Sequence, residues 1–278
     1  MQSQLRGYPN LAGKPYGRDG AMEARLAIDE LVRNADWNPA RLNALVVASY
    51  RESALPVILS NESLIEMPQR EWFDNFVGPF EIAQRLARLD GERRVFMTLR
   101  ESRSMLRSTW LHHVREGRVQ QYSDFLRRIT DDRSAGRGPF SIGALADAYG
   151  ELFGIDRVVV AFSEDFTSDP DRFWRRFVEV FDLRGFEPSL ADQVPRLNAT
   201  TLGPIGFELA ANRALNLYGS ISRRESTRPI RRWLTRHLSV RIRTDHHRFF
   251  GRFSGIEDPL VSAITADVSR VRARFTVL

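Results

Sequence analysis

The sequence predicts an α/β fold in which a parallel β-sheet is flanked by helices. Residues 95–99 and 157–162 are short apolar runs, as expected for strands buried on both faces of a sheet. Residues 56–64 begin as a third apolar run and end in a polar turn. Because helical spacing separates these runs, parallel pairing through right-handed crossovers is favoured.

The remaining elements follow from helical periodicity and turn signals. Residues 1–20 are rich in glycine and proline and predict turns. Residues 131–138 (DDRSAGRG) are polar and glycine-rich and predict a loop. The spacing predicts helices over 21–34, 39–48, 79–89, the dozen residues after Arg100, 121–130, 140–153, 169–181 and 207–217.

Length and charge suggest one α/β domain over 1–190 and a helical, basic C-terminal extension over 191–278 packed on it. The pattern changes after Pro188, and residues 223–252 are strongly basic with interleaved aromatic side chains. The net charge is 41 − 35 = +6. A basic balance suits an anionic nucleotide and suits nucleic acid equally, so charge does not choose between them.

Several classes of site are excluded by composition. Cysteine is absent, which rules out disulfides, a thiol nucleophile and cysteine-based zinc sites. No GxSxG or HExxH motif occurs and no GxGxxG follows a strand, and the fragment 245–247 (DHH) has no partner of the expected type, so we predict no metal. No apolar run approaches the roughly 20 residues that span a membrane, and no secretory segment is visible, so a cytoplasmic location is expected.

The junction between the strand predicted over 95–99 and the helix that follows it carries the clearest candidate site. Arg100 stands at the carboxyl end of the strand, where open α/β sheets bind ligands, and Ser104 and Ser108 follow on the helix, with Arg103 and Arg107 less closely placed. An arginine fork with a hydroxyl donor two turns later suits a phosphate group. The alternative is an ordinary solvated basic helix face.

Arginine, seven residues and then serine resembles the 3′-phosphate clamp of sulfotransferases that use 3′-phosphoadenosine 5′-phosphosulfate (PAPS). The resemblance implies a P-loop-NTPase-like sheet, with Arg100 and Ser108 binding the nucleotide 3′-phosphate. From its place at the same junction we predict Arg103 as a further cofactor-binding residue. The resemblance also implies PAPS as the donor substrate, without a metal. The acceptor would be a hydroxyl group of a carbohydrate or small metabolite.

Residues 56–64 are similar to the "SxE" strand end of bacterial and carbohydrate sulfotransferases, which makes Glu62 the candidate catalytic base. Burial at an apolar strand end can raise the pKa of a carboxyl group toward the working pH. The alternative is structural: Ser60 or Asn61 caps a helix beginning near Ile65, with Glu62 in its first turn.

Residues 157–183 resemble the segment "hhhhYEDLxxDPxxxhxxhhxFLG" of the same family, with Phe162 in place of Tyr and Phe166 in place of Leu. Its role there is mainly structural, beside the nucleotide site. Asp169 is expected to cap the following helix, and Pro170 suits the first helical position.

One family element is missing. A lysine-containing KxGTT loop after a strand normally cradles the 5′-phosphosulfate, but the single lysine is Lys14, followed by Pro15, in what looks like a "YxGKP" turn. Either the natural chain begins upstream, which the abrupt start favours, or this lineage lost the loop. In both cases the chain as written is expected to transfer sulfate poorly.

Two rival functions remain open. A degenerate sulfotransferase-like domain could bind an anionic ligand without catalysis. Residues 223–252 could instead bind nucleic acid, which the favoured interpretation does not expect, or contact an anionic membrane surface. Within them, Ile230, Trp233, Leu234 and Leu238 have the spacing of an amphipathic helix, whose ordinary role is to dock on its own domain.

Overall fold

A computed structural model describes residues 26–28, 30–32, 36–53, 57, 78–115, 120–136, 138, 140–183 and 246–278. The chain forms two compact units. The first comprises residues 1–99, 132–193 and 266–278, and the second comprises residues 100–131 and 194–265. The domain boundary expected at residue 190 lies outside the described residues and stays a prediction.

A parallel sheet lies at the centre of the first unit. Its described strands are β1 (Val95–Leu99), β2 (Val158–Phe162) and β3 (Thr276–Val277), in the order β1-β2-β3. Every residue of β2 is buried, as expected for a central strand covered on both faces. Leu99 pairs with Phe162, so β1 and β2 end at the same level. The expected α/β class, the two apolar strands and their parallel pairing are confirmed.

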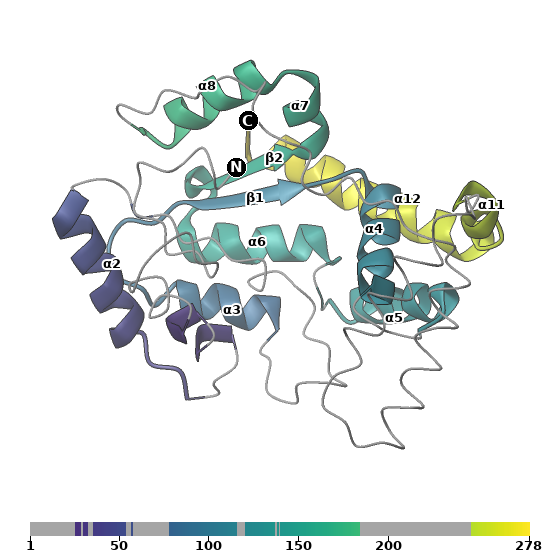
Figure 1. Ribbon diagram of the computed structural model, residues 1–278, viewed down its shortest axis with the longest axis horizontal. Coiled ribbons are helices and arrows are strands. Elements are labelled where there is room, and N and C mark those ends of the chain that lie inside the picture. The colour runs from purple at the N-terminus through teal and green to yellow at the C-terminus, as the bar shows by residue number, and fades with distance from the viewer. Residues whose placement is uncertain are drawn as a thin grey trace, which may run out of the picture. The chain divides into compact units, whose positions relative to one another are not determined.

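Helices cover both faces of this sheet (Figure 1). On one face lie α7 (Ser163–Ser168) and α8 (Pro170–Val180). The aromatic residues Phe173, Trp174 and Phe177 of α8 form a core with Ala161 of β2. On the other face lies α6 (Ile142–Phe153), with α3 (Pro79–Leu86) beyond it. Because side chains alternate across a strand, β2 contributes to both layers.

A second core in this unit joins α2 (Ala40–Ser53), α3 and the helical residues 26–32 that are described. Its buried members include Leu31, Leu42 and Ile82. The buried Arg85 of α3 donates to the backbone oxygen of Leu31 at 2.8 Å, so its charged group is satisfied inside the core.

The start of α8 is as expected. The carboxylate of Asp169 accepts from the backbone N–H of Arg172 at 3.0 Å, and Pro170 occupies the first turn. Asp169 therefore satisfies one of the amide donors that every helix leaves unpaired at its beginning.

The loop expected over 131–138 is wrong in its first half. The helix α5 (Tyr122–Ser134) continues through it, and Arg133 at its end donates to Asp267 at 3.0 Å and to the backbone oxygen of Phe140. This tertiary anchor outweighs the weak local preference of the polar residues. The turn begins afterwards, with Gly136 at a φ of 64°.

Other expectations differ at their boundaries or cannot be compared. The helix predicted over 39–48 continues to Ser53, and the one over 79–89 ends at Leu86. The segment 56–64 apart from Val57, the helix over 207–217 and residues 223–245 lie outside the described residues.

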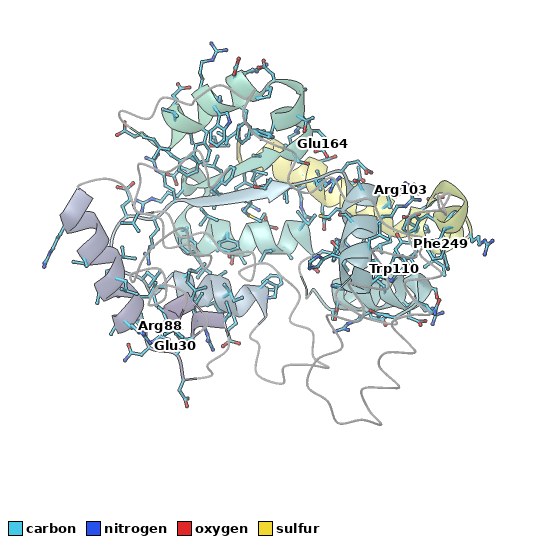
Figure 2. The ribbon with its side chains drawn as sticks, in the orientation of Figure 1. Glu30, Arg88, Arg103, Trp110, Glu164 and Phe249 are labelled. Atoms are coloured by element: carbon cyan, nitrogen blue, oxygen red, sulfur yellow. The ribbon has the colours of Figure 1, made fainter. Side chains whose placement is uncertain are left out.

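The second unit is built around aromatic side chains of α4 (Ser102–Arg115), α5 and α11 (His246–Gly251). Trp110 of α4 stacks on Phe249 of α11, with ring centroids 5.5 Å apart (Figure 2). The ring of Tyr122, at the start of α5, meets Phe250 edge-to-face at 4.8 Å. These contacts bury Trp110 and Tyr122 completely.

One long helix, α12 (Ser254–Arg274), runs through both units, because the division falls between residues 265 and 266. Its last turn leads into β3, a strand of two residues that is too short to give a recognisable sequence pattern. In the described part of the chain, no helix has the length and apolar composition needed to cross a membrane.

Candidate functional site

The predicted anion site begins where β1 ends. Arg100 follows Leu99 directly and is exposed, and α4 begins two residues later at Ser102. Among the described residues, the guanidinium of Arg100 has neither a carboxylate partner nor a hydrogen bond, and it retains its full donor capacity.

The first turn of α4 is capped by its own neighbour. The carboxylate of Glu101 accepts from the backbone N–H of Arg103 at 2.9 Å and from that of Ser104 at 2.6 Å. A negative charge is favourable at this end of a helix, and here the chain supplies it. An anion bound at this junction must therefore rely on side chains rather than on these two amides.

Ser108 lies in the second turn of α4 and is half-buried. Its hydroxyl donates to the backbone oxygen of Met105 at 3.1 Å. A hydroxyl has a single proton to donate, so Ser108 must leave this bond to donate to a phosphate.

The helix period separates the predicted ligands. Successive residues are about 100° apart around a helix, so Arg103 and Arg107 share one face while Ser104 and Ser108 share another, about 100° away. Arg100 precedes both faces. The three predicted cofactor-binding residues are therefore divided, with Arg103 on a different side of α4 from Ser108.

Arg103 and Arg107 turn toward a buried carboxylate on α12. Glu257 is fully buried, and Arg107 holds it with two hydrogen bonds, from Nε at 2.8 Å and from an Nη at 2.7 Å. Arg103 approaches the same carboxylate at 3.2 Å and Asp258 at 2.8 Å. The hydroxyl of Tyr122 donates to Glu257 at 2.7 Å, so three side chains close around one acid.

The electrostatics of this network favour the ion pair. Burial alone would raise the pKa of Glu257, but hydrogen bonds from Arg107 and Tyr122 and the charges of Arg107 and Arg103 outweigh it and lower that pKa below its usual 4.5. Burial and the hydrogen bond to Glu257 raise the pKa of Tyr122. Tyr122 therefore remains a donor at neutral pH, and Glu257 remains ionised.

The network gives Arg103 and Arg107 of α4 a structural role that sequence reasoning missed. Arg103, which was predicted to bind the cofactor, instead forms ion pairs with Glu257 and Asp258. The guanidinium of Arg107 also lies 4.6 Å from the ring centre of Phe250. Glu257 lies 150 residues from Arg107, so no local spacing could have indicated the pair.

The C-terminal part of α12 makes a comparable set of ion pairs within the first unit. Arg272 binds Asp165 of α7 at 2.7 Å and its guanidinium lies 4.1 Å from the ring centre of Phe162. Arg274 binds Asp147 of α6 at 2.6 Å. These arginines anchor α12 beside the sheet and are already neutralised.

Two predicted features fall elsewhere. Glu62, the candidate base, and Lys14, the single lysine, lie outside the described residues. No group of three or more potential metal ligands occurs among the residues that the structure describes. For the nucleotide, the described candidates for a 3′-phosphate are the exposed guanidinium of Arg100 and the hydroxyl of Ser108 once it leaves Met105, whereas no described residue matches the lysine loop that receives a 5′-phosphosulfate.

Comparison with known proteins adds no assignment, because no family model, no curated protein and no solved structure matches this chain.

Proposed function

We propose that this chain is a sulfotransferase-like protein that binds a 3′-phosphorylated adenosine nucleotide at the carboxyl end of β1. In this proposal the parallel sheet is the core of a P-loop-NTPase-like fold. The observation that carries the proposal is the contrast among neighbouring arginines: Arg103 and Arg107 are paired with Glu257, while Arg100 has no partner among the described residues.

A phosphate group fits the chemistry at Arg100. Guanidinium forms two parallel hydrogen bonds to phosphate oxygens, which orients the ligand as well as binding it. Ser108 would complete the clamp by exchanging its bond to Met105 for one to the phosphate. The carboxylate of Glu101 already accepts hydrogen bonds from two backbone amides of the first turn, so a phosphate gains little binding energy from them. The affinity for the phosphate therefore depends on the side chains of the clamp.

The proposed reaction is transfer of a sulfuryl group from PAPS to an acceptor hydroxyl of a carbohydrate or small metabolite. The acceptor oxygen forms a bond to sulfur while the bond from sulfur to the phosphate oxygen breaks, and 3′-phosphoadenosine 5′-phosphate leaves. Glu62 would accept the hydroxyl proton. Positioned cations and donors would stabilise the charge on the leaving phosphate.

Binding is the first test. Calorimetric titration gives the dissociation constants of adenosine 5′-phosphate and of 3′-phosphoadenosine 5′-phosphate. The ratio of the first constant to the second isolates the contribution of the 3′-phosphate. Arg100→Ala should reduce this ratio by about 10- to 150-fold, since a charge-assisted pair contributes about 1.5–3 kcal/mol. Arg127→Ala is the matched control, because Arg127 is exposed in the same unit and, among the residues that the structure describes, pairs with Asp124 on the surface. An unchanged ratio in Arg100→Ala rejects the clamp.

Catalysis is the second test. Because the lysine loop is missing from the sequence, incubation with PAPS and a panel of hydroxylated acceptors should give slow turnover, which Glu62→Gln abolishes while nucleotide binding remains. Binding without any turnover would instead favour the non-catalytic anionic-ligand-binding alternative.

A further inference from the structure

The network around Glu257 connects the candidate clamp to the second unit's core. We infer that Glu257 is a positioning residue, which fixes the rotation of α4 so that Ser108 faces the phosphate held by Arg100. This inference rests on the proposed function.

The contacts of α4 explain why Glu257 controls rotation. Two arginines one turn apart, Arg103 and Arg107, converge on a single buried carboxylate, and Arg107 does so with two hydrogen bonds of defined direction. Ser102 adds a hydrogen bond of 3.0 Å to Thr265, further along α12. Points of attachment on successive turns cannot all be kept if α4 turns about its axis.

Trp110, in the turn after Ser108, also holds α4. It packs against Phe249 and Phe250 and donates from Nε1 to the backbone oxygen of Gln120 at 3.0 Å. The ion pairs of Arg103 and Arg107 with Glu257 hold the part of the helix before Ser108, which is nearer to Arg100. Replacing a buried ion pair by apolar groups often preserves stability, so the value of this one lies in the geometry that it imposes.

A small rotation of α4 is enough to break the contact between Ser108 and the phosphate. The hydroxyl of Ser108 lies about 4 Å from the axis of α4, so a rotation of about 20° moves it by about 1.4 Å. A hydrogen bond of ordinary length does not survive that displacement. A loosened α4 therefore loses the Ser108 contact even when the helix itself remains folded.

The charges within the network also cancel one another. Arg103 and Arg107 carry two positive charges, and Glu257 and Asp258 carry two negative ones. Since this group is balanced, it neither repels nor binds a phosphate strongly, and Arg100 remains the cation that the described part of the junction offers to a ligand.

The test is the ratio of the dissociation constants of adenosine 5′-phosphate and 3′-phosphoadenosine 5′-phosphate, measured for Glu257→Gln well below its melting temperature. Loss of the Ser108 contact should reduce the ratio by about 5-fold, and the reduction should be absent when Arg100→Ala is already present. Asp267→Asn is the matched control, because Asp267 is an ion-paired acid of the same helix that contacts Arg133 and Arg270 instead of α4. It should leave the ratio unchanged.

The outcomes are separable. If Arg100→Ala lowers the ratio and Glu257→Gln does not, the positioning role is rejected and the proposed function stands. If Arg100→Ala has no effect, both fail. A higher ratio in Glu257→Gln also rejects positioning, because it would mean that freed arginines bind the nucleotide. Should Glu257→Gln not fold, Tyr122→Phe replaces it, because this variant removes one hydrogen bond from the same carboxylate. A reduction of the ratio by about 2-fold supports the positioning role, and an unchanged ratio rejects it.

Discussion

Replacing Glu257 by alanine should destabilise the second unit more than any surface charge change in it. Removing one partner of a buried ion pair costs about 3–5 kcal/mol, because the other partners stay desolvated. Arg107 and Arg103 retain 22% and 37% of their side-chain exposure, so water can partly solvate them once the acid is gone. The cost should therefore lie near the lower limit, at about 3 kcal/mol.

Hydrogen exchange measured by mass spectrometry reports this loss in α4 separately from the first unit. A loss of about 3 kcal/mol corresponds to amide exchange about 150-fold faster in peptides from α4. Asp124→Ala is the control, because it removes a surface pair with Arg127 that is worth about 0.5 kcal/mol or less. Exchange in Glu257→Ala no faster than in Asp124→Ala would refute the view that this carboxylate organises the unit.

Three further predictions follow from local chemistry. Because the folded-state pKa of Glu257 is lowered, its stabilising effect is complete above pH 4.5 and is lost as the pH falls through the folded value; circular dichroism should show a steeper acid transition in the wild type than in Glu257→Gln. Burial raises the pKa of Tyr149 to about 12, so its contribution is complete below pH 10.0 and declines as the pH rises to about 12, and tyrosinate absorbance should gain a late component that Tyr149→Phe removes. Asp169→Ala should lower the free energy of unfolding of the first unit by about 1 kcal/mol in urea titrations, and Asp169→Asn should restore most of it, since either residue can cap α8.

Local sequence signals predicted the elements whose causes are local. The continuous apolar run of β2 and the Asp169-Pro170 start of α8 indicate their structures within a few residues, and both are confirmed. The loop over 131–138 is wrong because a partner far along the chain, Asp267, anchors Arg133 and prolongs α5. The two residues of β3 become a strand only by pairing with β2, which no local pattern reveals.

The same distinction between local and distant causes applies to the residues of the candidate site. The position of Arg100 at a strand end could be predicted, because it depends only on where the apolar run stops. The role of Arg103 could not, because its partners Glu257 and Asp258 lie more than 150 residues later, on a helix that the sequence did not indicate individually. Glu62 lies outside the described residues, and its role stays a prediction.

In a chain this rich in arginine, the presence of an arginine near a strand end says little about binding, and its partners say more. Arg103 and Arg107 of α4 and the three arginines of α12 each bind a carboxylate, as Arg107 binds Glu257 and Arg272 binds Asp165. A guanidinium already paired in this way must break that pair to bind a phosphate, which offsets much of the gain. Arg100 carries no such cost within the described residues. For that reason its substitution, and not that of its neighbours, is the decisive experiment on whether this chain binds a 3′-phosphorylated nucleotide.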